Sequence, residues 1–266
     1  MNTSTEFNNV KPLVIKIGGA IIEESEAFDS LLAVVASLQN QPIVLVHGGG
    51  CLVDKMLSQA GYISEKKHGL RVTPAKHIPI ITGVLAGSVN KKIVAKATRL
   101  QLPAVGLSLS DGEMVRCKLS DKGLGMVGVP VAQESKLLDT LLKNQFLPVI
   151  SSIGSLSNGD LVNVNADDAA VVICQLLNAN LLLLTDVNGV KDKDGHYISS
   201  LDSKHAAQLI EQGIIAGGMT AKVNAALSAA NQLRRSIAVA SWQSPQQIIN
   251  LLNGENIGTR IQPNAC

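Results

Sequence analysis

Residues 13–19, LVIKIGG, and residues 43–50, IVLVHGGG, decide the fold. Each stretch joins a short aliphatic, β-branched run to a glycine turn, which is typical of a buried parallel strand that leads directly into a helix. Strand and helix patterns alternate along the rest of the chain, for example from a strand pattern at 181–184 to a helix pattern at 219–233. We therefore predict an α/β fold, a three-layer αβα sandwich with a mostly parallel central sheet.

The composition supports this class and excludes others. Of the 266 residues, 46% are hydrophobic, 17% are charged and 2% are aromatic. The hydrophobic content excludes a disordered chain, and the shortage of aromatic rings predicts an aliphatic core and argues against base-stacking platforms for nucleic acid. The formal net charge of +2 is too small to attract nucleic acid or an anionic membrane. We expect neither as a partner.

The sequence gives no sign of export or of a membrane span. The longest purely aliphatic runs, such as Leu181–Leu184, are far shorter than the roughly 20 residues of a span. Residues 1–11 lack the apolar segment of a signal peptide. The four cysteines are widely separated and form no CxxC pair, which argues against a zinc site or a disulfide framework. We predict a cytoplasmic protein with reduced thiols.

Two glycine turns are the first candidates for a binding site, because ligands of open parallel sheets bind beyond the carboxyl ends of the strands. Gly18 and Gly19 follow the first strand, and Gly48, Gly49 and Gly50 follow the second. Backbone N–H groups at the starts of helices attract anions. Glycines that only permit a tight turn are the alternative for a single turn. Two turns, one of them beside a lysine, favour anion binding.

Five polar residues stand near these turns or in similar patterns. Lys16 interrupts an apolar strand, and Lys222 lies in a helix pattern that is otherwise small and apolar. A charge among apolar residues is costly unless it meets a counter-charge or a ligand, although an edge strand or a solvated helix face would also accommodate it. Asp167, which follows Asn163, either caps a helix or places a carboxylate to hold a metal or to orient lysines. Arg71 is a candidate fork for a carboxylate, with an ordinary surface charge as the alternative.

Several catalytic signatures are missing. The sequence has no GxxxxGK[ST] phosphate loop, no GxGxxG turn after a strand and no HExxH motif. Residues 106–110 depart from the GxSxG pattern of hydrolases at the last position. The pattern DKDG at 192–195 supplies only part of a calcium loop and is better interpreted as a turn. The glycine turns and the lysines remain the main indication of chemistry.

The motifs taken together give the chain a family resemblance. They are KIGGA (16–20), VHGGG (46–50), HGLRVTP (68–74), ITGVLAGSVNK (81–91), LVNVNADDAA (161–170), LLTDVNGV (183–190), GGMTAKVNAA (217–226) and GTRI (258–261). On these motifs the chain resembles the amino acid kinase family over residues 13–261, nearly its whole length. KxGG with HGGG is typical of the whole family, whereas GLRVTP and NVNAD resemble its N-acetylglutamate branch.

The resemblance implies an activity and its reactants. ATP would phosphorylate the side-chain carboxylate of N-acetyl-L-glutamate to N-acetyl-L-glutamyl 5-phosphate, a step of arginine biosynthesis. Mg²⁺ would be held mainly by the phosphates of ATP, with no metal site built from protein side chains.

The resemblance also implies roles for individual residues. Lys16 and Lys222 would flank the transferred phosphoryl group as catalytic residues, and Asp167 would orient both lysines. The substrate would be bound by Gly49, Gly50, Arg71 and Asn163, the last two holding its α-carboxylate. The nucleotide would be bound by Gly18, Gly19, Gly48, Thr185, Asp186, Val187, Asn188, Gly189, Val190, Lys191, Ile214, Ile215 and Ala216.

Two lobes and a dimer follow from the same resemblance. Residues 1–178 would bind N-acetylglutamate and dimerise, and residues 179–266 would bind ATP. The helix pattern that opens at Thr73-Pro74, with proline in the first helical position, and reaches Arg99 would form the homodimer interface, with interruptions at Gly83 and Gly87. Arginine-inhibited members carry an extra N-terminal helix. The residues before the first strand here show no helical periodicity, so we expect insensitivity to arginine.

Two alternatives remain open. A kinase of the same family could act on N-acetyl-aminoadipate, carbamate or aspartate, and the pocket around Arg71 and Asn163 would decide between these acceptors. A catalytically inactive nucleotide- or metabolite-binding regulator is the alternative from another class. The presence of Lys16, Asp167 and Lys222 together argues against a regulator, because a sensor does not need both lysines. Ala221, where many relatives carry proline, departs from the family only locally.

Overall fold

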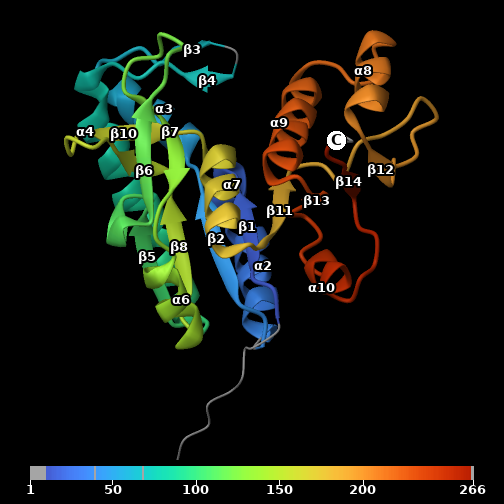
Figure 1. The fold of residues 1–266 in the computed structure, drawn as a ribbon, viewed down its shortest axis with the longest axis horizontal. Helices are drawn as coiled ribbons and strands as arrows, with labels where there is room; N and C mark the ends of the chain where they lie inside the picture. The colour runs from blue at the N-terminus through green and yellow to red at the C-terminus, as the bar shows by residue number, and fades with distance from the viewer. Residues whose placement is uncertain (1–9, 39, 68, 265–266) are drawn as a thin grey trace, which may run out of the picture.

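The computed structural model describes residues 10–38, 40–67 and 69–264 (Figure 1). The prediction that the N-terminal segment forms no helix, with the arginine insensitivity drawn from it, rests on residues 1–9 and lies outside the described residues. His68 of the predicted HGLRVTP motif and Cys266, predicted to be a reduced thiol, also lie outside them.

An eight-stranded sheet runs through the molecule in the order β12-β14-β13-β11-β1-β2-β8-β5. Its strands are β1 (Leu13–Ile17), β2 (Ile43–His47), β5 (Ala104–Ser108), β8 (Leu147–Ser151), β11 (Asn180–Thr185), β12 (Ser200–Leu201), β13 (Ile237–Ser241) and β14 (Thr259–Ile261). All neighbours from β13 to β5 pair in parallel. At the other end, β14 pairs antiparallel with β13 and parallel with β12. The predicted mostly parallel sheet is confirmed.

Helices cover both faces of this sheet, as the side chains of its strands require. On β1, Val14 packs into one hydrophobic cluster, whereas Leu13 and Ile15 pack into a second cluster on the opposite face. The first cluster is covered by α6 (Lys136–Lys143), α7 (Ala166–Leu177), α8 (Ser203–Glu211) and α9 (Gly218–Leu233). The second is covered mainly by α1 (Gly19–Glu23), α2 (Ser25–Ser37), α3 (Gly50–Gln59), α4 (Ile78–Thr82), α5 (Asn90–Arg99) and α10 (Gln247–Leu252). The three-layer αβα sandwich is confirmed.

One long helical run, residues 75–99, consists of the 3-10 turn η1 (Ala75–His77), α4, the π-helical segment η2 (Gly83–Val89) and α5. The helix was expected to be interrupted at Gly83 and Gly87. At these residues it changes from α-helical to π-helical pitch and does not break. The expected cap at Thr73 was wrong, because the Thr73 backbone pairs with Leu124 and Met126 and its hydroxyl donates to the Arg71 carbonyl. By length and apolar composition alone this run could cross a membrane, a test that core helices also pass.

A second, four-stranded sheet in the order β6-β7-β10-β9 lies beside the central one. Its strands are β6 (Val115–Leu119), β7 (Val127–Ala132), β9 (Ile153–Ser155) and β10 (Leu161–Val164), and the 3-10 turn η3 (Asp111–Glu113) precedes it. A two-residue hairpin is formed by β3 (Lys66–Lys67) and β4 (Leu70–Arg71). Because β10 ends directly before α7, the chain from Asn163 to Asp167 passes from this sheet to a helix packed on the central sheet.

The alternative in which Asp167 caps a helix was wrong. The cap of α7 is Asn165, whose side chain accepts hydrogen bonds from the backbone N–H groups of Asp167 and Asp168 at 2.7 and 3.3 Å. Capping by Asn165 leaves the Asp167 carboxylate available for another partner.

Candidate functional site

The two glycine turns touch each other at the carboxyl ends of β1 and β2. A Cβ atom on Gly19 would lie 3.3 Å from Cα of Gly49, and one on Gly48 would lie 3.3 Å from Cβ of Ala166 at the start of α7. These approaches are closer than ordinary van der Waals contact, so larger residues would push the turns and α7 apart. The starts of α3 and α7 thereby meet at one place, where backbone N–H groups favour anions.

The three predicted catalytic residues line one cavity of about 250 Å³, which also includes Gly18, Gly19, Thr185 and Trp242. Lys16 lies in the middle of the sheet between β11 and β2, which excludes the edge-strand alternative. Its Nζ lies 2.9 Å from Oδ1 of Asp167, and the two side chains are 18% and 26% exposed. This ion pair supplies the counter-charge that a lysine within an apolar strand requires.

Lys222 has a different partner in the structure. Its Nζ donates to Oδ1 of Asp186, which follows β11. The hydrogen bond from Lys222 holds the pKa of the Asp186 carboxyl below its usual range. Asp167 is therefore paired with Lys16 here, and the predicted orientation of both lysines by Asp167 remains a prediction.

His47, the residue before the three glycines, is fully buried. Its Nδ1 lies 2.9 Å from the Gly48 carbonyl, and its Nε2 lies 3.1 Å from Nδ2 of Asn90. Because a carbonyl can only accept, Nδ1 carries the proton and Nε2 accepts from Asn90, whose amide also donates to the Val149 carbonyl at 2.8 Å. Burial lowers the pKa of His47 to about 4. A neutral imidazole thus supports the glycine turn from inside the sheet.

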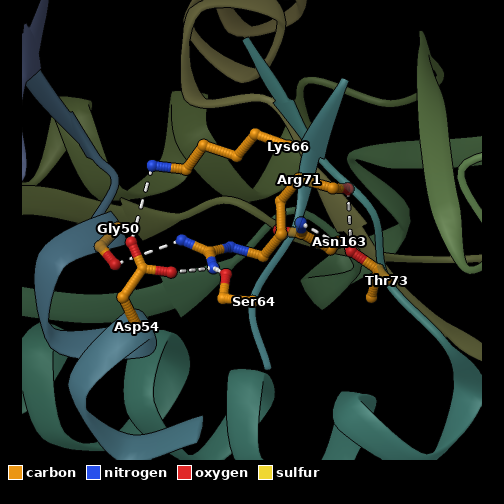
Figure 2. Close-up of polar contacts among 7 residues, drawn as sticks. All are labelled: Gly50, Asp54, Ser64, Lys66, Arg71, Thr73 and Asn163. Carbon is orange, nitrogen blue, oxygen red and sulfur yellow. Dashed lines mark hydrogen bonds and ion pairs between the residues drawn. The ribbon is translucent and has the colours of Figure 1, made fainter. Parts of the chain in front are cut away.

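Arg71, from the β3–β4 hairpin, points at the start of α3 (Figure 2). Its Nη1 donates to Oδ1 of Asp54 and to the Ser64 hydroxyl, and its Nη2 donates to the Gly50 carbonyl at 3.1 Å. The guanidinium beside Asp54 lowers the pKa of that carboxyl to about 2. Asn163 donates to the Thr73 hydroxyl at 3.2 Å. Arg71 therefore contacts the second glycine turn directly, and Asn163 is linked to Arg71 through the Thr73 hydroxyl.

A separate cavity of about 480 Å³ brings together two segments that the family resemblance assigns to the nucleotide. It is lined by Asp186, Val187, Asn188, Gly189, Val190, Lys191, Ile214, Ile215 and Ala216, with Tyr197, Met219 and Gln243 in addition. Asp186 borders this cavity and the one that holds the lysines. A third cavity, of about 720 Å³, is bordered by Leu70, Asp167 and Lys222. Within the part of the chain that the structure describes, no three His, Cys, Asp or Glu side chains gather to hold a metal ion.

Comparison with known proteins identifies the family of the chain. The model of the amino acid kinase family matches residues 11–241. The chain belongs to the amino acid kinase family. The acetylglutamate kinase of Colwellia psychrerythraea is 69% identical over 255 residues, covering 96% of this chain and 98% of that protein. The acetylglutamate kinase of Moritella profunda is 47% identical over 253 residues, covering 94% and 96%. In fold, the chain is similar to the solved structure of an N-acetylglutamate synthase from Neisseria gonorrhoeae complexed with coenzyme A and N-acetyl-glutamate, with a TM-score of 0.80. The two sequences are 22% identical, and the match covers 96% of this chain and 60% of that one.

Sequence reasoning missed three residues at this candidate site. Asp54 follows Gly50 by four residues, so the helix pattern could have placed both on one face of α3. Tyr197 is one of two tyrosines in the chain and follows the turn predicted at 192–195, which brings it back to pair with Lys191. Nothing in the sequence pattern of the long helix distinguishes Asn90.

Proposed function

We propose that this member of the amino acid kinase family uses ATP to phosphorylate the side-chain carboxylate of N-acetyl-L-glutamate, in arginine biosynthesis. The observation that carries the proposal is the convergence of Lys16, Asp167 and Lys222 on one cavity beside the glycine turns. The relatives named acetylglutamate kinase, at 69% and 47% identity, support the choice of acceptor.

The chemical problem is that both reactants are anions. A carboxylate oxygen must bond to the γ-phosphorus of ATP while the bond from that phosphorus to the β,γ-bridging oxygen breaks and ADP leaves. Two like unit charges about 4 Å apart repel by roughly 4 kcal/mol at an effective dielectric constant of about 20. Lys16 and Lys222, together with N–H groups of the glycine turns, would reduce this repulsion. Positioning and charge stabilisation are the main requirements of phosphoryl transfer.

The reaction needs no general base, because a carboxylate nucleophile is already ionised at neutral pH. This agrees with the environment of His47, which is buried, neutral and bonded to Gly48 and Asn90 rather than directed at a cavity. Asp167 would hold the ammonium group of Lys16 in place. We assign it a positioning role and no proton transfer.

The remaining assignments follow the cavities. Arg71 and Asn163 would hold the α-carboxylate of the substrate, and Gly49 and Gly50 its reacting end. Gly18, Gly19 and Gly48 would contact the phosphates, and the 480 Å³ cavity would hold the rest of the nucleotide. Mg²⁺ would be bound by the phosphates of ATP, and it would neutralise part of their charge.

The same proposal includes a homodimer, the two lobes 1–178 and 179–266, and a cytoplasmic location with reduced thiols. The helical run 75–99 is rich in apolar residues, and only a third of its most apolar window is buried within the described chain. Ile78, Ile80 and Val94 of this run are only half-buried, and a partner that covers these apolar side chains would bury them further. Analytical ultracentrifugation tests the dimer, and a monomer at micromolar concentration would contradict it.

The decisive experiment is ADP release with MgATP and N-acetyl-L-glutamate, with the acyl phosphate trapped as a hydroxamate. N-acetyl-aminoadipate, L-glutamate, L-aspartate and carbamate serve as matched acceptors. We expect product chiefly with N-acetyl-L-glutamate. Product only with another acceptor would overturn the assignment of Arg71 and Asn163, and ATP binding without turnover on any acceptor would indicate a regulator.

A further inference from the structure

Arg71 is held from one side by a cluster that consists of Asp54, Ser64 and Gly50 (Figure 2). Asp54 lies one helical turn after Gly50 on α3, so both face the β3–β4 hairpin. Lys66, also on the hairpin, places Nζ 3.5 Å from the second carboxylate oxygen of Asp54. The Arg71 side chain is 9% exposed and that of Asp54 is 37% exposed.

Counting the guanidinium donors shows which edge of Arg71 is still available. A guanidinium carries five N–H bonds. The two on Nη1 are directed to Asp54 and Ser64, and one on Nη2 is directed to the Gly50 carbonyl. No residue that the structure describes accepts from Nε or from the second N–H of Nη2. These two adjacent donors form the side-on edge that binds a carboxylate in bidentate geometry.

We propose that Asp54, assisted by Ser64, is a positioning residue that fixes the Nη1 end of Arg71 and so presents the Nε–Nη2 edge to the α-carboxylate of the acceptor. This rests on the proposed function, in which Arg71 binds that carboxylate. The Nη2 end lies at the glycine turn, where a Cβ on Gly50 would be 3.5 Å away. The pKa of about 2 keeps Asp54 ionised at neutral pH, so the clamp is present whenever the enzyme works.

A purely structural role makes a different prediction. The contacts of Asp54 with Arg71 and Lys66 tie the β3–β4 hairpin to α3. If they served only stability, removing the carboxylate would lower the melting temperature or the active fraction. The KM values of both substrates would then stay unchanged. A positioning role instead changes the KM of the acceptor selectively.

The test is steady-state kinetics of Asp54→Asn in the full chain. We expect the KM for N-acetyl-L-glutamate to rise about tenfold, a coupling typical of residues in one hydrogen-bond network, with kcat and the KM for ATP within about twofold. Ser64→Ala should give the same pattern with a smaller rise, and Asp54→Glu should recover part of the affinity. As a matched control, Asp29→Asn breaks a carboxylate–arginine pair with Arg99 away from the cavities and should leave all three constants unchanged.

A double-mutant cycle tests whether Asp54 affects the KM for N-acetyl-L-glutamate through Arg71. In an Arg71→Ala background, Asp54→Asn should cause no further rise in the KM for N-acetyl-L-glutamate. The inhibition constant of 4-acetamidobutyrate, which lacks the α-carboxylate but keeps the reacting one, should not change with Asp54→Asn. An additive effect of the two substitutions, or an equal loss for both compounds, would overturn the proposal. Failure of the function itself is recognised separately, because the unaltered chain would then form no hydroxamate with N-acetyl-L-glutamate.

Discussion

Protonation of His47 should destabilise the folded protein over a defined range of pH. The imidazole is fully buried, and its pKa falls from 6.5 to about 4 because burial disfavours the charged form. The charge of nearby Lys91 acts in the same direction. A group whose folded pKa is depressed contributes stability that is complete above its unfolded pKa. That stability is lost as the pH falls from about 6.5 to about 4.

The magnitude follows from the two pKa values. Their difference, at about 1.4 kcal/mol per pKa unit, corresponds to about 3 kcal/mol of unfolding free energy over the whole range. Of this, about 2 kcal/mol should be lost between pH 7.5 and pH 5. Most carboxylates titrate below pH 5, so this window isolates histidines. The pKa of His77, a second buried histidine, is also lowered by burial, and its contribution must be separated.

Urea unfolding of the unaltered protein and of His47→Gln at both pH values provides the assay. Because the glutamine does not titrate, the variant should lose about 2 kcal/mol less than the unaltered chain on acidification. His77 contributes equally to both proteins and cancels. Equal losses in the two proteins would refute the reasoning. If the variant does not fold, NMR titration of the imidazole in the unaltered protein decides, and a midpoint near 6.5 would refute it.

Three further predictions concern the two cavities and the packing of β5 against Asn90. Lys222→Met should lower kcat by roughly 10²–10³, as for other lost electrostatic donors, and near-full turnover in steady-state kinetics would contradict the two-lysine scheme. Tyr197→Ala should raise the KM for ATP roughly tenfold by removing an aromatic face from the proposed nucleotide cavity, whereas Tyr197→Phe should not. Gly106→Ala should lower the unfolding free energy by about 1–3 kcal/mol, because its methyl group would collide with the Asn90 amide; urea unfolding at pH 7.5 measures this, and a loss below 0.5 kcal/mol would contradict it.

The buried parallel strands were the part of the fold that the sequence predicted best. Strands buried on both faces are continuous aliphatic runs, so the first strand was predicted at Leu13–Ile17 and observed there. The reversal of direction at β14 could not be predicted, because a three-residue strand carries no sign of its orientation. Thr73-Pro74 has the composition of a helix cap, but the backbone hydrogen bonds of Thr73 to the segment around Gly125 prevent it from capping. Hydrogen bonds to a segment distant in sequence therefore decide the conformation of Thr73, rather than the local sequence.

The candidate site was predicted as a set of residues but not as a set of contacts. The family resemblance implied that Lys16, Asp167 and Lys222 act together, and the structure brings all three to one cavity. The partners of Lys222 and Arg71 are Asp186 and Asp54. Helical spacing could have placed Asp54 beside Gly50, but it does not show that Arg71 lies opposite, and nothing in the sequence pairs Asp186 with Lys222. Such pairs depend on how two elements that are distant in sequence pack, which composition and spacing do not encode.

The three cations proposed to meet anionic reactants each carry a carboxylate partner: Lys16 with Asp167, Lys222 with Asp186, and Arg71 with Asp54. Each pair is neutral as a unit, so the cations can be held partly buried without the cost of an unpaired charge. A bound reactant would then share the donors of a cation with its carboxylate partner or displace that carboxylate. The geometry of the available N–H donors would therefore matter more for binding the reactant than the total charge of the site. None of the three pairs crosses from residues 1–178 to residues 179–266. A change in the separation of the two proposed lobes would therefore break none of them, and each lobe would bring its own cations, already oriented, to the reactants.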